Sequence, residues 1–292
     1  SVENKPDVAT SVEAIMQKSI LNPYDDDLKY DGLYHCTKMI FLFPVIVLRI
    51  LWFLFTIAFA YLFSLMASEA QMRRYFTFPA KLMMYSFGFY RVKVKNRHLL
   101  TEIMKQRGLV VFNHVSMFDG ILLCGYVHPF AIALNSVHGS MGFFTHISRK
   151  LQYILIDYKR GGGQTAKLID HLARPGSNVI AIAPEGTTHA GRAVLRFRTG
   201  AFAPLRPVLP ILIRYPHRHF NPAWAFNYGL GVSLMRSMGQ FVSHASLELL
   251  PPMAPEPGEY AGQFAERVRQ RMAAELGLPT LNMGIEEGRE LV

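Results

Sequence analysis

The sequence predicts an α/β fold with a central, mostly buried sheet flanked by helices, preceded by an N-terminal membrane-attaching helix or two-helix hairpin. From residue 91 onward, short β-branched runs alternate with helix-length segments, as in layered α/β domains. A long, nearly uncharged apolar stretch precedes that region. The chain has 292 residues, of which 50% are hydrophobic and 18% charged. This length and composition favour one domain with one membrane element over a polytopic transporter.

The N-terminal part divides into a polar lead-in and an apolar segment. The apolar run from Met39 to Ala67 is interrupted only by Pro44 and Arg49. Its uncharged part, Ile50 to Ala67, is about 27 Å long as a helix, which is marginal against a hydrocarbon core of about 30 Å. A full span, a re-entrant segment and a buried hairpin therefore all stay open. The predicted division is 1–37 polar lead-in, 38–90 membrane-anchoring helical motif, 91–279 catalytic domain and 280–292 C-terminal tail.

After the apolar run, apolar residues recur every three or four positions from Tyr75 to Tyr90, which predicts a second helix on or in the membrane. The flank after the run is more basic than the flank before it, so the downstream domain is expected on the cytosolic side.

Seven apolar runs in the catalytic domain predict strands, and five segments between them predict helices. Continuous apolar runs are typical of parallel strands buried on both faces, and active residues are expected where such strands end. The predicted strands are Val92–Val94, Leu109–Phe112, Phe130–Leu134, Tyr153–Ile156, Val179–Ala183, Val208–Ile213 and Ser246–Leu250. The predicted helices are His98–Gln106, Met117–Val127, Met141–Leu151, Thr165–Ala173 and Glu259–Leu276.

His114 and Asp119 form the first candidate site, directly after the second predicted strand. Five residues is an awkward spacing for one helix face, so the pair fits a turn. Ser116 is expected to cap a helix that begins at Met117, which would put Asp119 in the first turn near His114. A carboxylate on one imidazole nitrogen leaves the other free to take a proton from an alcohol. The spacing alone also fits a capped helix beside a surface histidine.

The second candidate site follows the strand that ends near Ala183. Glu185 there is either a turn residue in a loop or a buried-edge carboxylate paired to an arginine. Gly186, Thr187 and Thr188 offer close backbone approach and hydroxyl groups, which suit a phosphate or a lipid headgroup.

Charge and cysteine content narrow the function classes. The formal net charge is +10, and the stretch from Gly186 to Leu247 holds no acidic residue but seven arginines. Such a face suits anionic lipid or a phosphorylated cofactor, whereas the motifs of nucleic-acid-binding domains are absent. Cys36 and Cys124 predict no disulfide framework and a reducing compartment. His217 and His219 have no nearby cysteine or acid, so no metal site is expected.

Four ordered blocks resemble the glycerophospholipid acyltransferases, also called 1-acylglycerol-phosphate or lysophospholipid acyltransferases. The blocks are NHxSxxD (Asn113, His114, Ser116, Asp119), a basic block (Tyr158, Lys159, Arg160), PEGT (Pro184, Glu185, Gly186, Thr187) and a strand with an internal proline (Val208, Leu209, Pro210, Ile211). The resemblance implies that His114 is the general base and Asp119 orients it. It also implies substrate-binding roles for Asn113, Ser116, Arg160, Glu185, Gly186, Thr187 and Thr188.

The resemblance further implies acyl-CoA or acyl carrier protein as donor and a lysophospholipid as acceptor, without an acyl-enzyme or a permanent cofactor. The residues agree with a transfer that has no acyl-enzyme, because the sequence offers no GxSxG motif and no cysteine beside a base as a nucleophile. The expected partners are acyl-CoA, lysophospholipid and membrane lipids, with the domain on the cytosolic face of the endoplasmic reticulum or of a bacterial inner membrane. Oligomeric state and acyl-chain preference are not readable from the sequence.

One departure from the family pattern bears on the acceptor. Members acting on lysophosphatidic acid often carry a basic residue after the PEGT threonine, whereas this chain has Thr188 and His189. The pattern therefore favours the branch that acylates lysophosphatidylcholine or lysophosphatidylethanolamine. Lysophosphatidic acid or glycerol 3-phosphate as acceptor, a non-catalytic lipid-binding scaffold and a CoA-independent transacylase remain alternatives.

Overall fold

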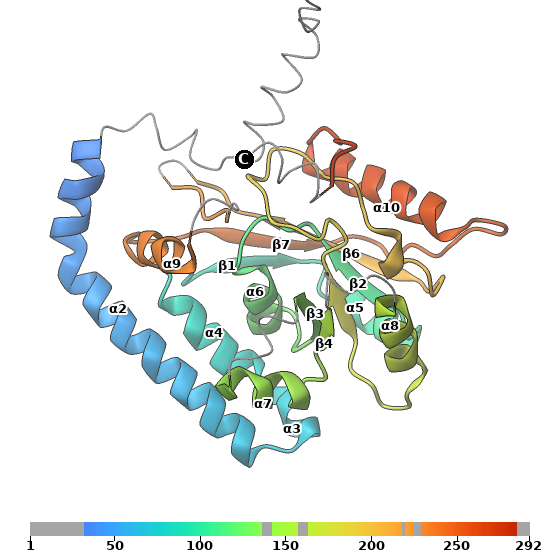
Figure 1. Ribbon diagram of the computed structural model, residues 1–292, viewed down its shortest axis with the longest axis horizontal. Coiled ribbons are helices and arrows are strands. Elements are labelled where there is room, and N and C mark those ends of the chain that lie inside the picture. The colour runs from blue at the N-terminus through green and yellow to red at the C-terminus, as the bar shows by residue number, and fades with distance from the viewer. Residues whose placement is uncertain (1–31, 136–141, 157–162, 218–219, 225–228, 285–292) are drawn as a thin grey trace, which may run out of the picture.

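The computed structural model describes residues 32–135, 142–156, 163–217, 220–224 and 229–284 (Figure 1). Its seven described strands form one sheet in the order β1-β7-β6-β2-β5-β3-β4. The strands are β1 (Val92–Lys95), β2 (Leu109–Phe112), β3 (Ala131–Asn135), β4 (Ile154–Ile156), β5 (Ile180–Ile182), β6 (Val208–Arg214) and β7 (Ala245–Leu249). All seven predicted strands are confirmed within a residue or two at their ends.

The three central strands run in the same direction. Strand β2 pairs parallel with β5 through Val110 and Ala181, and parallel with β6 through Val111 and Pro210. Only the pairing of β6 with β7 is antiparallel among the described strands. Every residue of β2 and β5 is buried, as their continuous apolar sequences predict. The carboxyl ends of β6, β2 and β5 therefore meet at one edge of the sheet.

Helices cover both faces of the sheet, and two apolar cores fill the space between them. One core joins the sheet to α2, α4 and α6, and the other joins it to α8 and α10. The described helices are α2 (Gly32–Met66), α3 (Glu69–Tyr75), α4 (Thr77–Tyr85), α5 (Leu99–Lys105), α6 (Asp119–Tyr126), α7 (Gly142–Lys150), α8 (Gln164–Ala173), α9 (Leu230–Met238) and α10 (Ala261–Leu276).

The apolar helix α2 is attached to the domain along its length. It contacts α9, α4 and α7 in turn, and Figure 1 shows it running along one side of the domain. Near its middle, the buried Arg49 guanidinium donates to the carbonyls of Met238, Gln240 and Phe241 and to the hydroxyl of Tyr90. One described helix, over Thr37–Met66, is long and apolar enough to cross a membrane.

Two details differ from the sequence-based expectations. The apolar helix begins at Gly32, ahead of the predicted run. The helix predicted from Tyr75 to Tyr90 is shorter, α4 over Thr77–Tyr85, and a separate helix, α3, ends at Tyr75 just before it. Ser68 caps α3, and the ring of Pro79 removes the N–H that would continue the helical ladder through the junction.

Helix α9 is absent from the predicted elements because its apolar residues do not form one stripe: Met238 and Leu234 pack on the core, but other apolar residues do not. Its serines, Ser233 and Ser237, are buried, while Leu230, Val232 and Met235 are exposed. A search for an apolar stripe facing the core therefore does not find this helix.

Candidate active site

Three loops at the carboxyl edge of the sheet build the candidate site. The loop after β2 carries His114, the loop after β5 carries Glu185, and Tyr215 follows β6 directly. Since β6, β2 and β5 are neighbours and parallel, these side chains converge although up to 101 positions separate His114 from Tyr215 in the chain. The strand-end position predicted for the site is confirmed.

His114 and Asp119 are in direct contact. The Nδ1 atom of His114 lies 2.8 Å from Oδ2 of Asp119. The His114 side chain is 29% exposed, whereas the Asp119 side chain is fully buried. Within the described part of the chain, the other ring nitrogen, Nε2, has no hydrogen-bond partner. The histidine therefore presents one nitrogen outward and keeps the other on the carboxylate.

Asp119 accepts hydrogen bonds from four donors. Its Oδ2 accepts from the backbone N–H groups of Val115 (2.8 Å) and Ser116 (2.9 Å) as well as from His114. Its Oδ1 accepts a short hydrogen bond from the Tyr215 hydroxyl. Burial raises the pKa of Tyr215 well above its usual value, and the neighbouring Asp119 carboxylate raises it further. Tyr215 therefore stays a neutral donor to the Asp119 carboxylate.

This arrangement selects the imidazole tautomer. An ionised carboxylate only accepts, so Nδ1 of His114 carries the proton and Nε2 carries the lone pair. The exposed Nε2 can take a proton from a hydroxyl, and Asp119 stabilises the imidazolium that results.

Glu185 faces inward and holds three segments together. Its Oε1 accepts from the His114 backbone N–H (2.9 Å), and its Oε2 accepts from His189 Nε2 (2.7 Å) and the Leu195 backbone N–H (2.9 Å). Glu185 and His189 are each 1% exposed. Glu185 is thus a buried carboxylate, but the arginine expected as its partner is replaced, among the described residues, by a histidine and two backbone groups.

The side chains of Asn113 and Ser116 form hydrogen bonds with backbone groups from distant parts of the chain. The Asn113 amide donates to the carbonyl of Ile213 and accepts from its N–H, so this side chain extends the pairing of β2 with β6. The Ser116 hydroxyl donates to the carbonyl of Pro222. The same hydroxyl accepts from the backbone N–H of Phe118 at 3.3 Å, as a capping serine does. Helix α6 nevertheless begins at Asp119 rather than at Met117, with Phe118 in the cap position.

The remaining predicted residues lie around the turn after β5. Gly186 has φ +71°, which favours glycine, and the side chain of Arg198 lies across it. Thr187 is buried and its hydroxyl donates to the carbonyl of Thr188, which is half-buried. Arg160, together with Tyr158 and Lys159, lies outside the described residues.

Sequence reasoning did not assign roles to Tyr215 and His189. Tyr215 could have been found, because it directly follows a central strand, β6, and active residues are expected where such strands end. His189 carried the weaker signal of a histidine four residues after Glu185. In neither case does the sequence show which way the side chain points.

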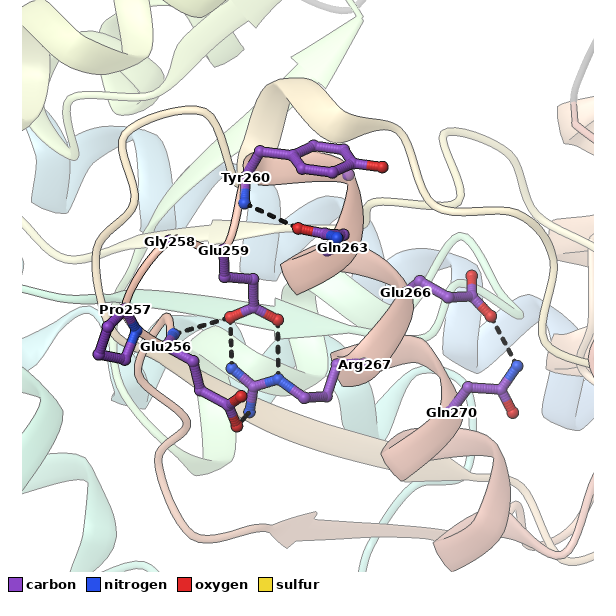
Figure 2. A pocket seen from close by; sticks show the side chains of 10 residues that line it. Glu256, Pro257, Gly258, Glu259, Tyr260, Gln263, Glu266, Arg267 and Gln270 are labelled. Atoms are coloured by element: carbon purple, nitrogen blue, oxygen red, sulfur yellow. Dashed lines mark hydrogen bonds and ion pairs between the residues drawn. The ribbon is translucent and has the colours of Figure 1, made fainter.

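A hollow at the surface lies away from these residues. Figure 2 shows this cavity of about 680 Å³ at the start of α10, lined by Glu256, Glu259, Tyr260 and Arg267 among others. Arg267 binds Glu259 through two nitrogens, at 2.6 and 2.9 Å. None of the predicted site residues lines this hollow. Within the described ranges, no group of three histidine, cysteine or acidic side chains is placed to hold a metal ion.

Comparisons with known proteins find similar chains among acyltransferases. Residues 91–214 match the model of the Acyltransferase family. The chain is 29% identical over 259 residues to the lysophospholipid acyltransferase LPEAT2 of Arabidopsis thaliana, a match that covers 82% of this chain and 46% of that protein. It is 30% identical over 223 residues to the lysophosphatidylcholine acyltransferase of Drosophila melanogaster, covering 73% of this chain and 41% of that protein. The chain thus spans less than half of the length of these relatives.

A solved structure shares the fold. The 1-acyl-sn-glycerophosphate acyltransferase PlsC of Thermotoga maritima aligns with a TM-score of 0.59 at 20% identity. The alignment covers 82% of this chain and 98% of that one. This likeness confirms the predicted α/β architecture with a preceding apolar helix.

Proposed function

We propose, on the premise that residues 91–214 of this chain belong to the Acyltransferase family, that the protein transfers a fatty acyl group from acyl-CoA to the free hydroxyl of a lysophospholipid. The observation that carries the proposal is the open Nε2 of His114, whose Nδ1 is bound to Asp119 at 2.8 Å. The relatives named as lysophospholipid acyltransferases support the choice of reaction.

The mechanism needs no acyl-enzyme. Nε2 of His114 takes the proton of the acceptor hydroxyl while the hydroxyl oxygen forms a bond to the thioester carbonyl carbon. The carbonyl then reforms as the carbon–sulfur bond breaks, and the imidazolium returns the proton to the CoA thiolate. The products are the diacyl phospholipid and free CoA. Asp119, which is fully buried, stabilises the imidazolium between the two proton transfers.

The acceptor in this proposal is lysophosphatidylcholine or lysophosphatidylethanolamine. The position after Thr187 holds Thr188, which has no charge, and the next residue, His189, is buried against Glu185. Neither residue offers a cation to a phosphomonoester. Both curated relatives reported above carry names of the lysophospholipid or lysophosphatidylcholine branch.

Arg198 is the cation placed to attract the acceptor phosphate. A Cβ atom at Gly186 would lie 2.7 Å from Arg198 Nε, so the arginine side chain packs directly on the turn that carries Glu185. Glu185 in turn contacts the His114 backbone. A guanidinium there suits the single charge of a phosphodiester headgroup.

The proposed location is a membrane surface, with the outer face of α2 in the lipid. Large apolar side chains on this face are open to the surroundings: Phe41 is 79% exposed, Leu48 66% and Met66 88%. At the two ends of the helix, Lys38 binds Gln240 and Lys150 binds the carbonyl of Ala67, so polar groups of the domain flank both ends. This attachment favours a helix that dips into one leaflet with the domain beside it over an isolated perpendicular span.

The test is an acceptor panel with the purified protein and one labelled acyl-CoA. Lysophosphatidylcholine, lysophosphatidylethanolamine, lysophosphatidic acid and glycerol 3-phosphate are compared, with a no-thioester reaction to detect transacylation. We expect turnover with the choline or ethanolamine acceptor. A preference for the phosphomonoesters would overturn the headgroup assignment, and no turnover with any acceptor would contradict the enzymatic proposal.

A further inference from the structure

We infer that His189 is a positioning residue that acts through Glu185 on the backbone of His114. The inference rests on the proposed function, because it concerns the base of that reaction. It assigns a role to a side chain that lies outside the catalytic pair. It also assigns Glu185, at the same turn, to holding the base rather than to contacting the acceptor.

The tautomer of His189 is fixed by its two neighbours. The backbone N–H of Gly191 donates to Nδ1 of His189 at 3.1 Å, so Nδ1 is an acceptor and the ring proton sits on Nε2. That proton points at Oε2 of Glu185, 2.7 Å away. His189 is therefore a neutral donor to an ionised carboxylate, which is a charge-assisted hydrogen bond.

Glu185 is buried and holds donors from the protein itself. Its three donors come from His114, His189 and Leu195, at distances between 2.7 and 2.9 Å. A carboxylate that is 1% exposed and already holds three donors stabilises its surroundings instead of receiving a substrate. Without the His189 donor, Oε2 would keep only the Leu195 N–H, and the buried charge would be less well compensated.

Glu185 contacts the backbone N–H of His114 and so fixes the position of the backbone that carries the imidazole ring. The loop that carries His189 also packs on the next residue of the catalytic loop, because a Cβ atom at Gly191 would lie 3.2 Å from Cγ1 of Val115. In addition, Asn221 donates to the carbonyl of Ala190 at 3.2 Å. The His189 loop therefore supports the His114 loop at two adjacent residues, while Asp119 sets the orientation of the ring.

The experiment compares His189→Leu with His189→Gln in steady-state acyl transfer from acyl-CoA to the preferred lysophospholipid. Leucine fills similar space but has no donor, whereas the glutamine amide offers an N–H near the place of Nε2. The matched control is His171→Leu, since His171 is also buried, at 6% exposed, and bonds only to the carbonyl of Asn178. Thermal unfolding of each variant is measured alongside activity.

We expect His189→Leu to lower kcat roughly tenfold to a hundredfold, because small misplacements of a reacting group cost up to about that factor. The KM values for both substrates should change little, and His189→Gln should restore most of kcat. His171→Leu should lose thermal stability at unchanged kcat. A folded His189→Leu with wild-type kcat, or a loss confined to KM, would overturn the inference.

A second variant covers the case in which His189→Leu does not fold. Glu185→Gln keeps the shape of the side chain but replaces one carboxylate oxygen by an NH2 group. If the amide oxygen still accepts from His189 and Leu195, the NH2 group faces the backbone N–H of His114, and two donors then oppose each other. We expect a similar fall in kcat, and full activity would contradict the inference. An inactive wild type contradicts the proposed function and the inference together. An active wild type beside fully active variants contradicts the inference alone.

Discussion

Strand β5 has a buried histidine network at each of its two ends, and the two networks differ in composition. At the carboxyl end, His114 and His189 bind the carboxylates of Asp119 and Glu185. At the amino end, His128 and His171 bind Asn178, through its side chain at 3.4 Å and its carbonyl at 2.8 Å. One network contains two acids, whereas the other two histidines contact amide oxygens of Asn178.

The difference shows that burial of a histidine does not by itself indicate a catalytic site. Burial lowers the pKa of His128 and of His171, so both stay neutral at the amino end. At the carboxyl end, a buried carboxylate stands behind each ring, and the ring of His114 is partly open to substrate. A carboxylate behind an accessible ring allows the ring to gain and lose a proton during turnover.

The largest expected effect comes from removing the open ring. His114→Ala should reduce acyl transfer by about a hundredfold to ten-thousandfold, the usual contribution of a general base. Binding to lipid vesicles should not change, because α2 is untouched. The exposed His244→Ala serves as the control with wild-type rate. Full residual activity of His114→Ala in a radiolabelled acyl-transfer assay would rule out the mechanism.

Tyr215→Phe should have the next largest effect. The substitution removes the one donor that reaches Oδ1 of Asp119 among the described residues, and it leaves a buried carboxylate oxygen without a partner. We expect about 1–3 kcal/mol less stability from the lost bond to a charged group. The kcat should fall roughly tenfold as Asp119 loses its fixed position. If kcat and unfolding temperature both stay at wild-type values, the hydroxyl has no such role.

Asn178→Ala tests the other network. The Asn178 amide donates to the carbonyl of Pro129 at 2.6 Å and accepts from the N–H of Val179 at 3.0 Å. Losing these buried bonds should cost about 1–3 kcal/mol of stability, measured by chemical unfolding in detergent. The kcat of the folded fraction should not change. A selective loss of kcat would mean that the two ends of β5 are coupled.

The smallest effect is a pH dependence of stability. His128 and His171 have pKa values below the ordinary value of 6.5 in the fold, so the unfolded chain binds more protons than the folded chain below that pH. Stability should therefore rise with pH in that window and fall on acidification, by at most about 1.4 kcal/mol per histidine for each pH unit. Unfolding midpoints of wild type and His171→Gln at pH 5.5 and 7.5 measure the difference. An equal loss in both proteins would exclude His171 as its source.

The sequence predicted the sheet well because its strands are buried on both faces. A run such as Leu109–Phe112 is apolar throughout and bounded by polar or glycine residues, so its position is unambiguous. Boundaries were less predictable where tertiary contacts override local preference. The helix expected from Met117 begins only at Asp119, where the Ser116 hydroxyl donates to the carbonyl of Pro222, a residue 106 positions away.

The site could be located from the sequence but not fully assigned. His114 and Asp119 lie in a single short turn, so their contact follows from local spacing. Glu185 and Tyr215 reach the same place only because β5, β2 and β6 are neighbours in the sheet. The sequence indicates neither that order nor the direction of the Glu185 carboxylate, which turned toward the backbone of His114 instead of outward.

The hydrogen bonds of Arg49 fix the position of α2 along its own axis relative to the domain that it contacts. Its guanidinium holds three carbonyls between Met238 and Phe241, so α2 cannot slide along its axis without breaking all of them. Under the proposed membrane attachment, the helix and the domain would therefore tilt together, or deform the lipid, in a thicker or thinner bilayer. Bilayer thickness is then expected to alter how a lysophospholipid reaches His114 without a change in any residue.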